Sequence, residues 1–301
     1  MSGKNLTTPA NTQWTIIKLL QWAASYLKSH DIDSPRATGE ILLAHALKLE
    51  RIELYLNYDQ PLLGDELKAF KLLIKRRIGR EPVAYILGVK EFWSLDLEVT
   101  RDVLIPRPET ECLVEAALEL LSKYSSSQAK RILDLGTGSG AIVLALASQQ
   151  PQHTYFASDL STTALEAAHR NAKRHDLCEI IQFFAADWLK ALRPEKSAFD
   201  MIVSNPPYIP SRVIQGLQPE INRYEPIAAL DGEEDGLESF RKILESVHHC
   251  LKPAGELLLE IGHDQKDAVH KIAFDCGYYA DFSCTKDYCG HDRVVYMRRK
   301  V

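Results

Sequence analysis

Hydrophobic residues in the first part of the chain recur at helical spacing. Over residues 14–27 the apolar positions fall three and four residues apart, which predicts an amphipathic helix. Pro35 follows a serine of the kind that caps helices and predicts the start of a second helix. Asp65 is predicted to cap a third helix, which Gly79 closes. No strand pattern occurs within residues 1–88, so this stretch is predicted to form a small helical bundle.

The hydrophobic pattern changes after this helical stretch. Short alternating runs between Val89 and Val103 predict a β-hairpin, and we assign residues 89–106 to a linker. The two prolines of Ile105–Glu111 then break the chain before another helix, whose apolar positions are four residues apart. A serine loop at residues 125–127 is predicted to follow this helix.

Strands and helices alternate through most of the remaining chain. Apolar runs predict strands at Arg131–Leu135, His153–Asp159, Ile180–Asp187, Phe199–Asn205 and Glu256–Ile261. Helices are predicted from Ala141, from Ser161, over Leu237–Leu251 and from Asp264. Such alternation is typical of βαβ units and a parallel sheet.

The end of the chain departs from this alternation. Two strand-like runs, Tyr278–Thr285 and Arg293–Arg298, are separated by only about seven residues, so they are predicted to pair as an antiparallel hairpin. The predicted fold class is therefore α/β. A doubly wound, mostly parallel sheet with an antiparallel C-terminal hairpin occupies residues 107–301, and the helical bundle and hairpin linker precede it.

The most informative motif is Asn205-Pro206-Pro207-Tyr208, which directly follows a continuous apolar run. Such a run predicts a buried parallel strand, and two prolines cannot continue its ladder. The prolines stiffen the backbone and offer carbonyls without N–H donors, while Asn205 adds an amide and Tyr208 an aromatic face. Ligands bind at the carboxyl ends of strands in open α/β sheets, so this cup suits a planar –NH2 group. The alternative interpretation is a proline-rich surface turn.

A second motif lies upstream, between the first predicted strand of the sheet and its helix. The loop Asp134–Ala141 contains three glycines, which permit a tight turn and close approach of the backbone to a ligand. Asp159 ends the next strand, about 20 residues on, where a carboxylate can accept both hydroxyls of a ribose. Asp187 and Trp188 follow the third strand and offer an acceptor and a surface for an adenine. Alternatively, they are a helix cap and a core residue.

This second motif indicates an adenosine-type ligand without identifying it. The loop also fits a dinucleotide site, and alone it is weak evidence. The close spacing of its glycines and the preceding Asp134 favour a ligand with an amino-acid tail.

Composition narrows the class of protein. The chain has 301 residues, and its 46% hydrophobic and 26% charged residues are ordinary globular values. No apolar run approaches the roughly 20 residues that crossing a bilayer requires. Met1 to Thr15 lacks a secretory pattern, and six cysteines without a CxxC pair suit reduced thiols. We therefore expect a cytoplasmic protein without a membrane partner.

The cysteines do not indicate a metal site. Cys284, Cys289 and His291 lie near one another in the sequence, but β-like sequence surrounds them and no fourth ligand is close. No metal is expected.

Charge disfavours a general nucleic-acid binder. The net charge is −5, whereas such proteins are usually basic, so no DNA partner is expected. The segment Lys68–Arg80 is nevertheless strongly basic. It is interpreted either as a solvated helix face or as a contact surface for an acidic or RNA-bearing partner.

Several segments together resemble the HemK/PrmC family of protein-glutamine methyltransferases. The resemblance runs from about residue 80 to the end, in order and spacing. It rests on the glycine loop and the Asn-Pro-Pro-Tyr motif, and on Leu104–Glu111, Glu225-Pro226, Asp235–Leu237, Leu259–Gly262 and Asp292–Val294. Of these, Leu104–Glu111 is the most specific, because adenine and cytosine amine methyltransferases share Asn-Pro-Pro-Tyr. The departures are small: Ser94, Leu97 and Glu233 stand where the family usually has glycine, phenylalanine and glycine.

The resemblance implies a fold, a reaction and a substrate. The fold would be that of class I methyltransferases, with S-adenosyl-L-methionine as donor and S-adenosyl-L-homocysteine as product. The acceptor would be the side-chain amide of the glutamine in the Gly-Gly-Gln motif of class I peptide chain release factors. The helical first domain, residues 1–88, would bind the release factor.

The resemblance also implies roles for single residues. The catalytic residues would be Asn205, Pro206 and Tyr208. The cofactor would be bound by Gly136, Thr137, Gly138, Ser139, Gly140, Asp159, Asp187, Trp188 and Asn205. The acceptor would be bound by Asn205, Pro206, Pro207 and Tyr208, with Arg107, Glu109 and Phe92 shaping the entrance. For these last three, packing and helix capping are the alternative.

Three other functions compete with this reading. A nucleic-acid amine methyltransferase acting on an adenine would use the same cup on a flipped base. A non-catalytic adaptor could bind release factors or ribosomes, although the intact loop, Asp159 and Asn205 argue against it. A nicotinamide oxidoreductase would use the glycine loop but would have no use for Asn-Pro-Pro-Tyr.

Overall fold

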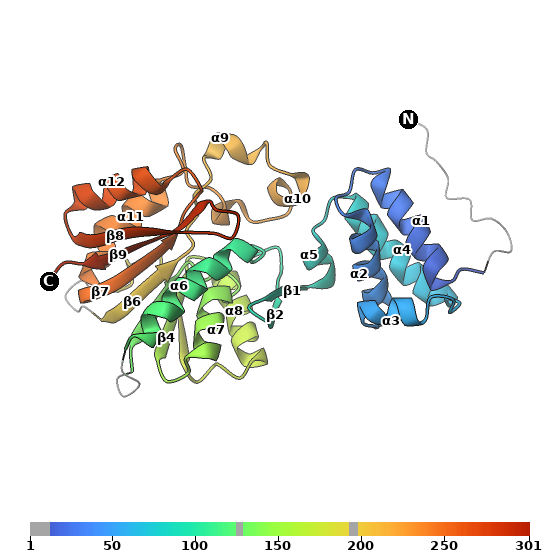
Figure 1. The fold of residues 1–301 in the computed structure, drawn as a ribbon, viewed down its shortest axis with the longest axis horizontal. Helices are drawn as coiled ribbons and strands as arrows, with labels where there is room; N and C mark the ends of the chain where they lie inside the picture. The colour runs from blue at the N-terminus through green and yellow to red at the C-terminus, as the bar shows by residue number, and fades with distance from the viewer. Residues whose placement is uncertain (1–12, 125–128, 193–197) are drawn as a thin grey trace. The chain divides into compact units, whose positions relative to one another are not determined.

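The structure of this protein is a computed structural model, which describes residues 13–124, 129–192 and 198–301. The predicted serine loop and the first twelve residues of the chain lie outside these ranges. The chain divides into two compact units, Met1–Leu87 and Gly88–Val301, coloured from blue to red in Figure 1. None of the helices in these ranges has the length and hydropathy that crossing a bilayer requires.

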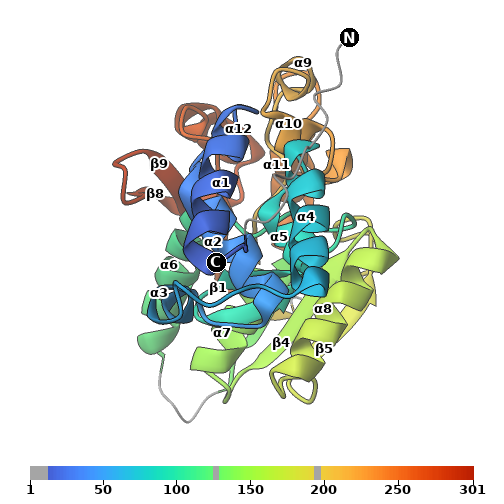
Figure 2. The ribbon, with the colours of Figure 1, turned by 90° about the vertical axis from the view of Figure 1, so that its right-hand side faces the viewer.

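The first unit is a helical bundle, as predicted. Its helices are α1 (Ile16–Lys28), α2 (Pro35–Leu47), α3 (Arg51–Leu56), α4 (Gly64–Ile78) and α5 (Val83–Leu87). Figure 2 looks onto this bundle, in which α1, α2 and α4 pack against one another. Their apolar faces enclose a core that includes Leu19, Leu42, Leu43, Leu54, Phe70 and Ile74. The helices α3 and α5 were not predicted, because five or six residues are too few to show a helical period.

Two of the predicted helix ends differ in detail. The helix α4 begins at Gly64, and Asp65 lies in its first turn. The cap is made instead by Glu66, whose side chain accepts the N–H of Leu63 at 2.7 Å. At the other end Gly79 has a φ of −73°, and the left-handed residue is Arg80, with a φ of +72°. Pro35 occupies the first turn of α2 as predicted.

The second unit starts with the predicted hairpin. Its strands, β1 (Val89–Phe92) and β2 (Leu95–Glu98), pair in antiparallel fashion. Asn171, which is fully buried, fixes β2: its Oδ1 accepts the N–H of Glu98 at 2.6 Å, and its Nδ2 donates to the carbonyls of Glu98 and Ser139. The hairpin is thereby tied to the glycine loop. A short helix, η1 (Pro108–Thr110), then leads into α6 (Glu111–Ser122).

A seven-stranded sheet forms the centre of this unit. Its strands are β3 (Arg131–Leu135), β4 (Thr154–Asp159), β5 (Ile181–Ala185), β6 (Phe199–Ser204), β7 (Leu251–Glu260), β8 (Tyr279–Lys286) and β9 (Asp292–Arg299). They lie in the order β5-β4-β3-β6-β7-β9-β8, and all neighbours are parallel except those of β9. The predicted fold class is therefore confirmed, including the antiparallel hairpin at the end.

Helices cover both faces of the sheet (Figure 1). One face packs on α6, α7 (Ala141–Gln149) and α8 (Thr162–Arg174). The other packs on α11 (Glu238–Ser246) and α12 (Lys266–Cys276). Short helices α9 (Ser211–Ile214), α10 (Pro219–Asn222) and η2 (Ile227–Ala229) lie in the long segment after β6. Because the strand order reverses between β3 and β6, a ligand site is expected where their carboxyl ends meet.

The segment between α11 and β7 was predicted less well. The helix stops at Ser246, a short turn η3 (Val247–His249) follows, and β7 begins at Leu251 rather than at Glu256. The pairing of β6 with β7 shifts register near Phe199, and Ala254 has a φ of +59°. The irregular start of β7 contains a proline and a glycine. These residues are typical of a turn, so the sequence pattern did not indicate a strand there.

Candidate functional site

The glycine loop between β3 and α7 has a backbone that glycine favours. Gly136, Gly138 and Gly140 have φ values of +71°, +56° and +85°. Close packing adds a second constraint at Gly140, where a Cβ would lie 3.0 Å from Leu144 Cδ1 and 3.2 Å from Ala168 Cβ. By contrast, nothing lies within 4 Å of a Cβ at Gly136 or Gly138, so the backbone there is open to a ligand.

Hydrogen bonds from inside the sheet hold this loop. The N–H groups of Gly136 and Thr137 both donate to the Ser158 carbonyl at 2.9 Å. The Thr137 hydroxyl donates to Asp134 Oδ2 at 2.7 Å. Burial raises the pKa of Asp134 to about 7, against the lowering effect of the Thr137 hydroxyl and the Val143 N–H. Asp134 therefore supports the loop from behind.

Asp159, at the end of β4, closes the other side of the loop. Its Oδ2 accepts the N–H of Gly138 and its Oδ1 accepts the N–H of Ser161, each at 2.9 Å. Burial raises the pKa of this carboxyl, and the surrounding backbone N–H groups oppose that shift. Each oxygen has more than one lone pair, so the carboxylate can accept further bonds from a ligand.

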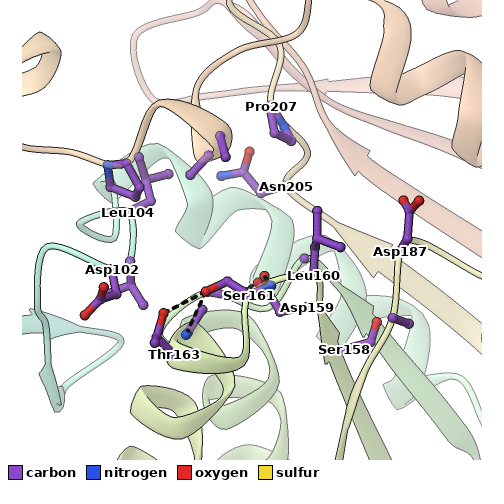
Figure 3. A pocket seen from close by; sticks show the side chains of 18 of the residues that line it. Asp102, Leu104, Ser158, Asp159, Leu160, Ser161, Thr163, Asp187, Asn205 and Pro207 are labelled. Atoms are coloured by element: carbon purple, nitrogen blue, oxygen red, sulfur yellow. Dashed lines mark hydrogen bonds between the residues drawn. The ribbon is translucent and has the colours of Figure 1, made fainter.

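A cavity of about 380 Å³ lies against the loop and Asp159 (Figure 3). It is lined by Arg101, Asp102, Val103, Leu104, Gly136, Gly138, Ser158, Asp159, Leu160, Ser161, Thr163, Ala164, Ala186, Asp187, Trp188, Asn205, Pro207, Pro226, Ala228 and Ala229. The structure thus brings residues from the ends of β3, β4, β5 and β6 to one cavity, at the position expected from the strand order.

Two residues of the Asn-Pro-Pro-Tyr motif, Asn205 and Pro207, line this cavity, whereas Pro206 and Tyr208 do not. Asn205 Nδ2 donates to Thr110 Oγ1 at 3.2 Å. Within the described residues, no group donates to Asn205 Oδ1 or to the Pro206 carbonyl. The Tyr208 hydroxyl donates to Glu260 Oε1 at 3.3 Å, and Gln265 Nε2 holds the Tyr208 carbonyl at 3.0 Å. Hydrogen bonds thus hold Asn205 and Tyr208 in place and leave two acceptors available, while the binding of a planar –NH2 group at this motif stays a prediction.

A buried glutamate ties another wall together. Glu225 accepts the N–H of Ile105 at 3.1 Å and pairs with the Arg107 guanidinium at 2.5 Å. On the two segments that Glu225 joins, the cavity is lined by residues 101–104 and by Pro226, Ala228 and Ala229. Arg107 does not itself line the cavity, and its role in shaping the entrance stays a prediction.

Some predicted site residues do not reach the cavity. Phe92 is 1% exposed and packs in the core with α6, so its side chain does not shape an entrance. This expectation is corrected in favour of the packing alternative. Glu109 is exposed in η1, and the side chains of Thr137 and Ser139 are buried behind the loop. Trp188 packs against the core, as its alternative interpretation expected, and also lines the cavity; its contact with an adenine stays a prediction.

Several cavity residues were missed. Leu160 is 71% exposed at the cavity. It is followed there by Ser161, which caps α8, and by Thr163 and Ala164 in the first turn of that helix. They follow Asp159 directly, so their place in the sequence could have indicated them. Nothing in the local sequence marks Ala228 and Ala229, which approach the cavity because Glu225 fixes their loop.

The described residues contain no group of three or more His, Cys, Asp or Glu side chains arranged to hold a metal ion. Cys289 is exposed, Cys284 is half-buried, and the N–H of His291 donates to Asp287.

A separate groove of about 600 Å³ lies within the helical bundle, between α1 and α4. Its floor includes Trp22 and Tyr26, whose rings stack with centroids 4.9 Å apart. Lys68, Lys71 and Lys75 line it as well. The rest of the basic segment is engaged elsewhere, since Arg76 pairs with Glu81 and Arg77 is buried. The lysines are thus the part of the segment that faces the groove.

Comparison with known proteins gives consistent matches over nearly all of the chain. Residues 18–88 match the family described as the PrmC N-terminal domain, and residues 113–216 match the methyltransferase small domain. The chain is 42% identical to a release factor glutamine methyltransferase of Geobacter sulfurreducens, over 94% of this chain and 96% of that protein. It is 36% identical to a protein of the same name from Rhodopirellula baltica, over 97% and 99% of the two chains.

The fold has counterparts among solved structures. The delta-N METTL16 methyltransferase domain superposes with a TM-score of 0.53 at 18% identity, over 70% of this chain and 91% of that chain. This likeness concerns the fold alone.

Proposed function

Because this chain belongs to the family of release factor glutamine methyltransferases, we propose that it methylates the glutamine side chain of the Gly-Gly-Gln motif in class I peptide chain release factors. The methyl donor is S-adenosyl-L-methionine. Within the structure, the observation that carries this proposal is the pair of unoccupied acceptors, Asn205 Oδ1 and the Pro206 carbonyl, beside a cavity suited to the donor.

The residues of the cavity fit S-adenosyl-L-methionine. The open backbone at Gly136 and Gly138 allows the amino-acid tail of this ligand to approach closely. Asp159 can accept the ribose hydroxyls, and Asp187 and Trp188 can contact the adenine. The bound donor supplies a methyl group on a sulfonium, which is already an activated leaving group.

The chain's own contribution to the reaction is to position the acceptor. An amide nitrogen is a poor nucleophile, because its lone pair is delocalised into the carbonyl. Asn205 Oδ1 and the Pro206 carbonyl accept its two N–H bonds, which orients the nitrogen and raises its electron density. Tyr208 covers the acceptor side chain with its ring. No general base is needed, since the methylated amide loses its extra proton readily.

We assign release-factor binding to the helical bundle, residues 1–88, and to its groove in particular. The match of residues 18–88 to the PrmC N-terminal domain supports this assignment. The groove combines aromatic rings with three lysines, so it suits an acidic surface that carries an apolar anchor. Because the acceptor is a translation protein, we place the activity in the cytoplasm and propose no DNA partner.

Charge reversal on the groove tests the assignment to the bundle. The double variant Lys68→Glu/Lys71→Glu is expected to raise KM for the release factor roughly tenfold by weakening electrostatic attraction. Its Kd for S-adenosyl-L-methionine should stay unchanged. Steady-state kinetics and calorimetry measure the two constants. The matched control Lys18→Glu/Lys28→Glu changes the same charge on α1 at exposed residues outside the groove. Equal KM values for both double variants would refute the assignment.

The proposed reaction is tested by mass analysis of the acceptor. A class I release factor incubated with this protein and S-adenosyl-L-methionine should gain the mass of one methyl group, and replacing the Gly-Gly-Gln glutamine should abolish the gain. The alternative is an adenine amine methyltransferase, which would instead label DNA or RNA. Labelled nucleic acid with an unmodified release factor would overturn the proposal.

A further inference from the structure

The side-chain amide of Asn205 can point in two ways, and only one of them suits an amide acceptor. Its nitrogen donates to Thr110 Oγ1 at 3.2 Å, which leaves its oxygen without a partner among the described residues. Asn205 lines the cavity, and Thr110 is buried at 4% exposure. If the amide were reversed, an –NH2 group would face the –NH2 group of the acceptor. The acceptor is therefore bound productively only if the Asn205 amide is held with its oxygen toward the cavity.

The proton of the Thr110 hydroxyl determines this orientation. A hydroxyl has one proton, so it accepts from Asn205 reliably only if its own proton is directed to another acceptor. The side chain beside it is Glu260, which is 1% exposed at the end of β7 and close enough to the Thr110 hydroxyl for that hydroxyl to lower the pKa of Glu260. Glu260 Oε2 is buried and has no hydrogen-bond partner among the described residues, so it can accept the Thr110 proton. Tyr208 donates to the other oxygen.

We propose that Thr110 and Glu260 are positioning residues, which orient the Asn205 amide so that its oxygen faces the acceptor. The inference rests on the proposed function, since it concerns how the same cup holds its substrate. A carboxylate at Glu260 can only accept hydrogen bonds, so it directs the Thr110 proton toward itself and leaves the Thr110 lone pairs for Asn205. Neither residue lines the cavity, so both act through Asn205.

This arrangement depends on the charge of Glu260. The pKa of Glu260 is raised to about 7: burial raises it most and Glu109 adds to the rise, while the hydroxyls of Thr110 and Tyr208 and the charge of Arg293 oppose it. Arg293 is itself paired with Asp287 at 3.0 Å. The charge of Glu260 in turn contributes to the raised pKa of Cys112 on α6. A protonated Glu260 can donate to Thr110, which frees the Thr110 proton for Asn205 Oδ1 and permits the reversed amide.

The direction in which kcat depends on pH follows from the hydrogen bonds between Glu260, Thr110 and Asn205. The productive arrangement needs the carboxylate, so it is complete above the pKa of Glu260 and is lost as the pH falls through it. With both substrates saturating, kcat is expected to rise with pH through about 7 in the wild type.

Removal of the hydroxyl tests the positioning role. Thr110→Val keeps the shape of the side chain and is expected to lower kcat about 10- to 100-fold, with Kd for S-adenosyl-L-methionine unchanged. Thr110→Ser, which keeps the hydroxyl, should restore most of kcat. The wild type is assayed first on a release factor, so that failure of the proposed function is recognised separately. Near-normal kcat in Thr110→Val, or equal losses in both variants, would overturn the inference.

A second variant tests the role of Glu260. Glu260→Gln carries an amide that can donate to Thr110 at any pH, so its kcat should be low and flat between about pH 6 and 8. Thermal unfolding and cofactor binding show whether each variant is folded. If Glu260→Gln is folded and retains the pH profile of the wild type, the titrating group is elsewhere and the inference fails. If Glu260→Gln does not fold, the serine and valine variants at position 110 still decide it.

Discussion

Replacing Asn205 with alanine is expected to lower kcat for release-factor methylation on the order of 100- to 1000-fold, the range seen when one preorganised polar group is removed from an active site. The variant loses the oxygen that we propose accepts an N–H of the acceptor, while the Pro206 carbonyl remains. The glycine loop and Asp159 do not depend on Asn205 for any hydrogen bond, so the Kd for S-adenosyl-L-methionine should change little. Single-turnover methylation and calorimetry measure the two effects.

The matched control for this prediction is Asn57→Ala. Asn57 also donates its side-chain amide within the protein, to the Glu53 carbonyl at 2.9 Å, but it belongs to the other compact unit. Its kcat should be close to that of the wild type. Near-normal turnover of Asn205→Ala, with the cofactor bound normally, would show that the cup does not orient the acceptor.

The architecture was predictable because its signals are local and repeated. Buried parallel strands give continuous apolar runs, and the helices between them carry apolar positions at a period of 3.6 residues. The strand β6 and the antiparallel pair β8–β9 were therefore found near their observed bounds. The errors occur where the signal is short or ambiguous. They concern the short helices α3 and α5, and the irregular start of β7, which reads as a turn.

Site residues were predictable where they lie directly after a strand. The glycine loop, Asp159 and Asn205 each follow an apolar run directly, and the structure brings them to one cavity. The residues that support them come from segments far apart in the sequence. Glu225 holds the backbone 120 residues before it, and Tyr208 meets Glu260 across 52 residues.

One signal for the supporting residues was present in the sequence. Glu260 interrupts a run of leucines and an isoleucine, and a carboxyl group within a buried strand needs a partner or a raised pKa. The sequence therefore indicates that Glu260 needs a polar neighbour inside the protein. Its neighbours, however, are set by the order of the strands and by the placement of η1, which a single sequence does not specify.

The second large effect is expected at Asp159, where cofactor binding rather than turnover should respond. Its carboxylate is held by the N–H groups of Gly138 and Ser161, so its oxygens are fixed where ribose hydroxyls can donate to them. A hydrogen bond to a charged group contributes about 1.5–3 kcal/mol. In a solvated cleft each bond is at the low end of this range, so two such bonds contribute roughly 3 kcal/mol to the binding free energy. Because 1.4 kcal/mol corresponds to a factor of ten, Asp159→Ala should raise the Kd for S-adenosyl-L-methionine about 100-fold.

Asp159→Ala should raise the Kd for S-adenosyl-L-methionine and leave kcat nearly unchanged, whereas Asn205→Ala should lower kcat and leave this Kd nearly unchanged. At saturating S-adenosyl-L-methionine the aspartate variant should recover most of its kcat, because the cup is intact. In the wild type, the raised pKa of Asp159 means that cofactor affinity should begin to fall at a higher pH than for an ordinary aspartate, as the carboxylate becomes protonated. The control Asp176→Asn removes the same charge at an exposed position whose φ of +59° asparagine tolerates. Calorimetric Kd values for Asp159→Ala within about threefold of the control would exclude a ribose contact at Asp159, since that difference is below 1 kcal/mol.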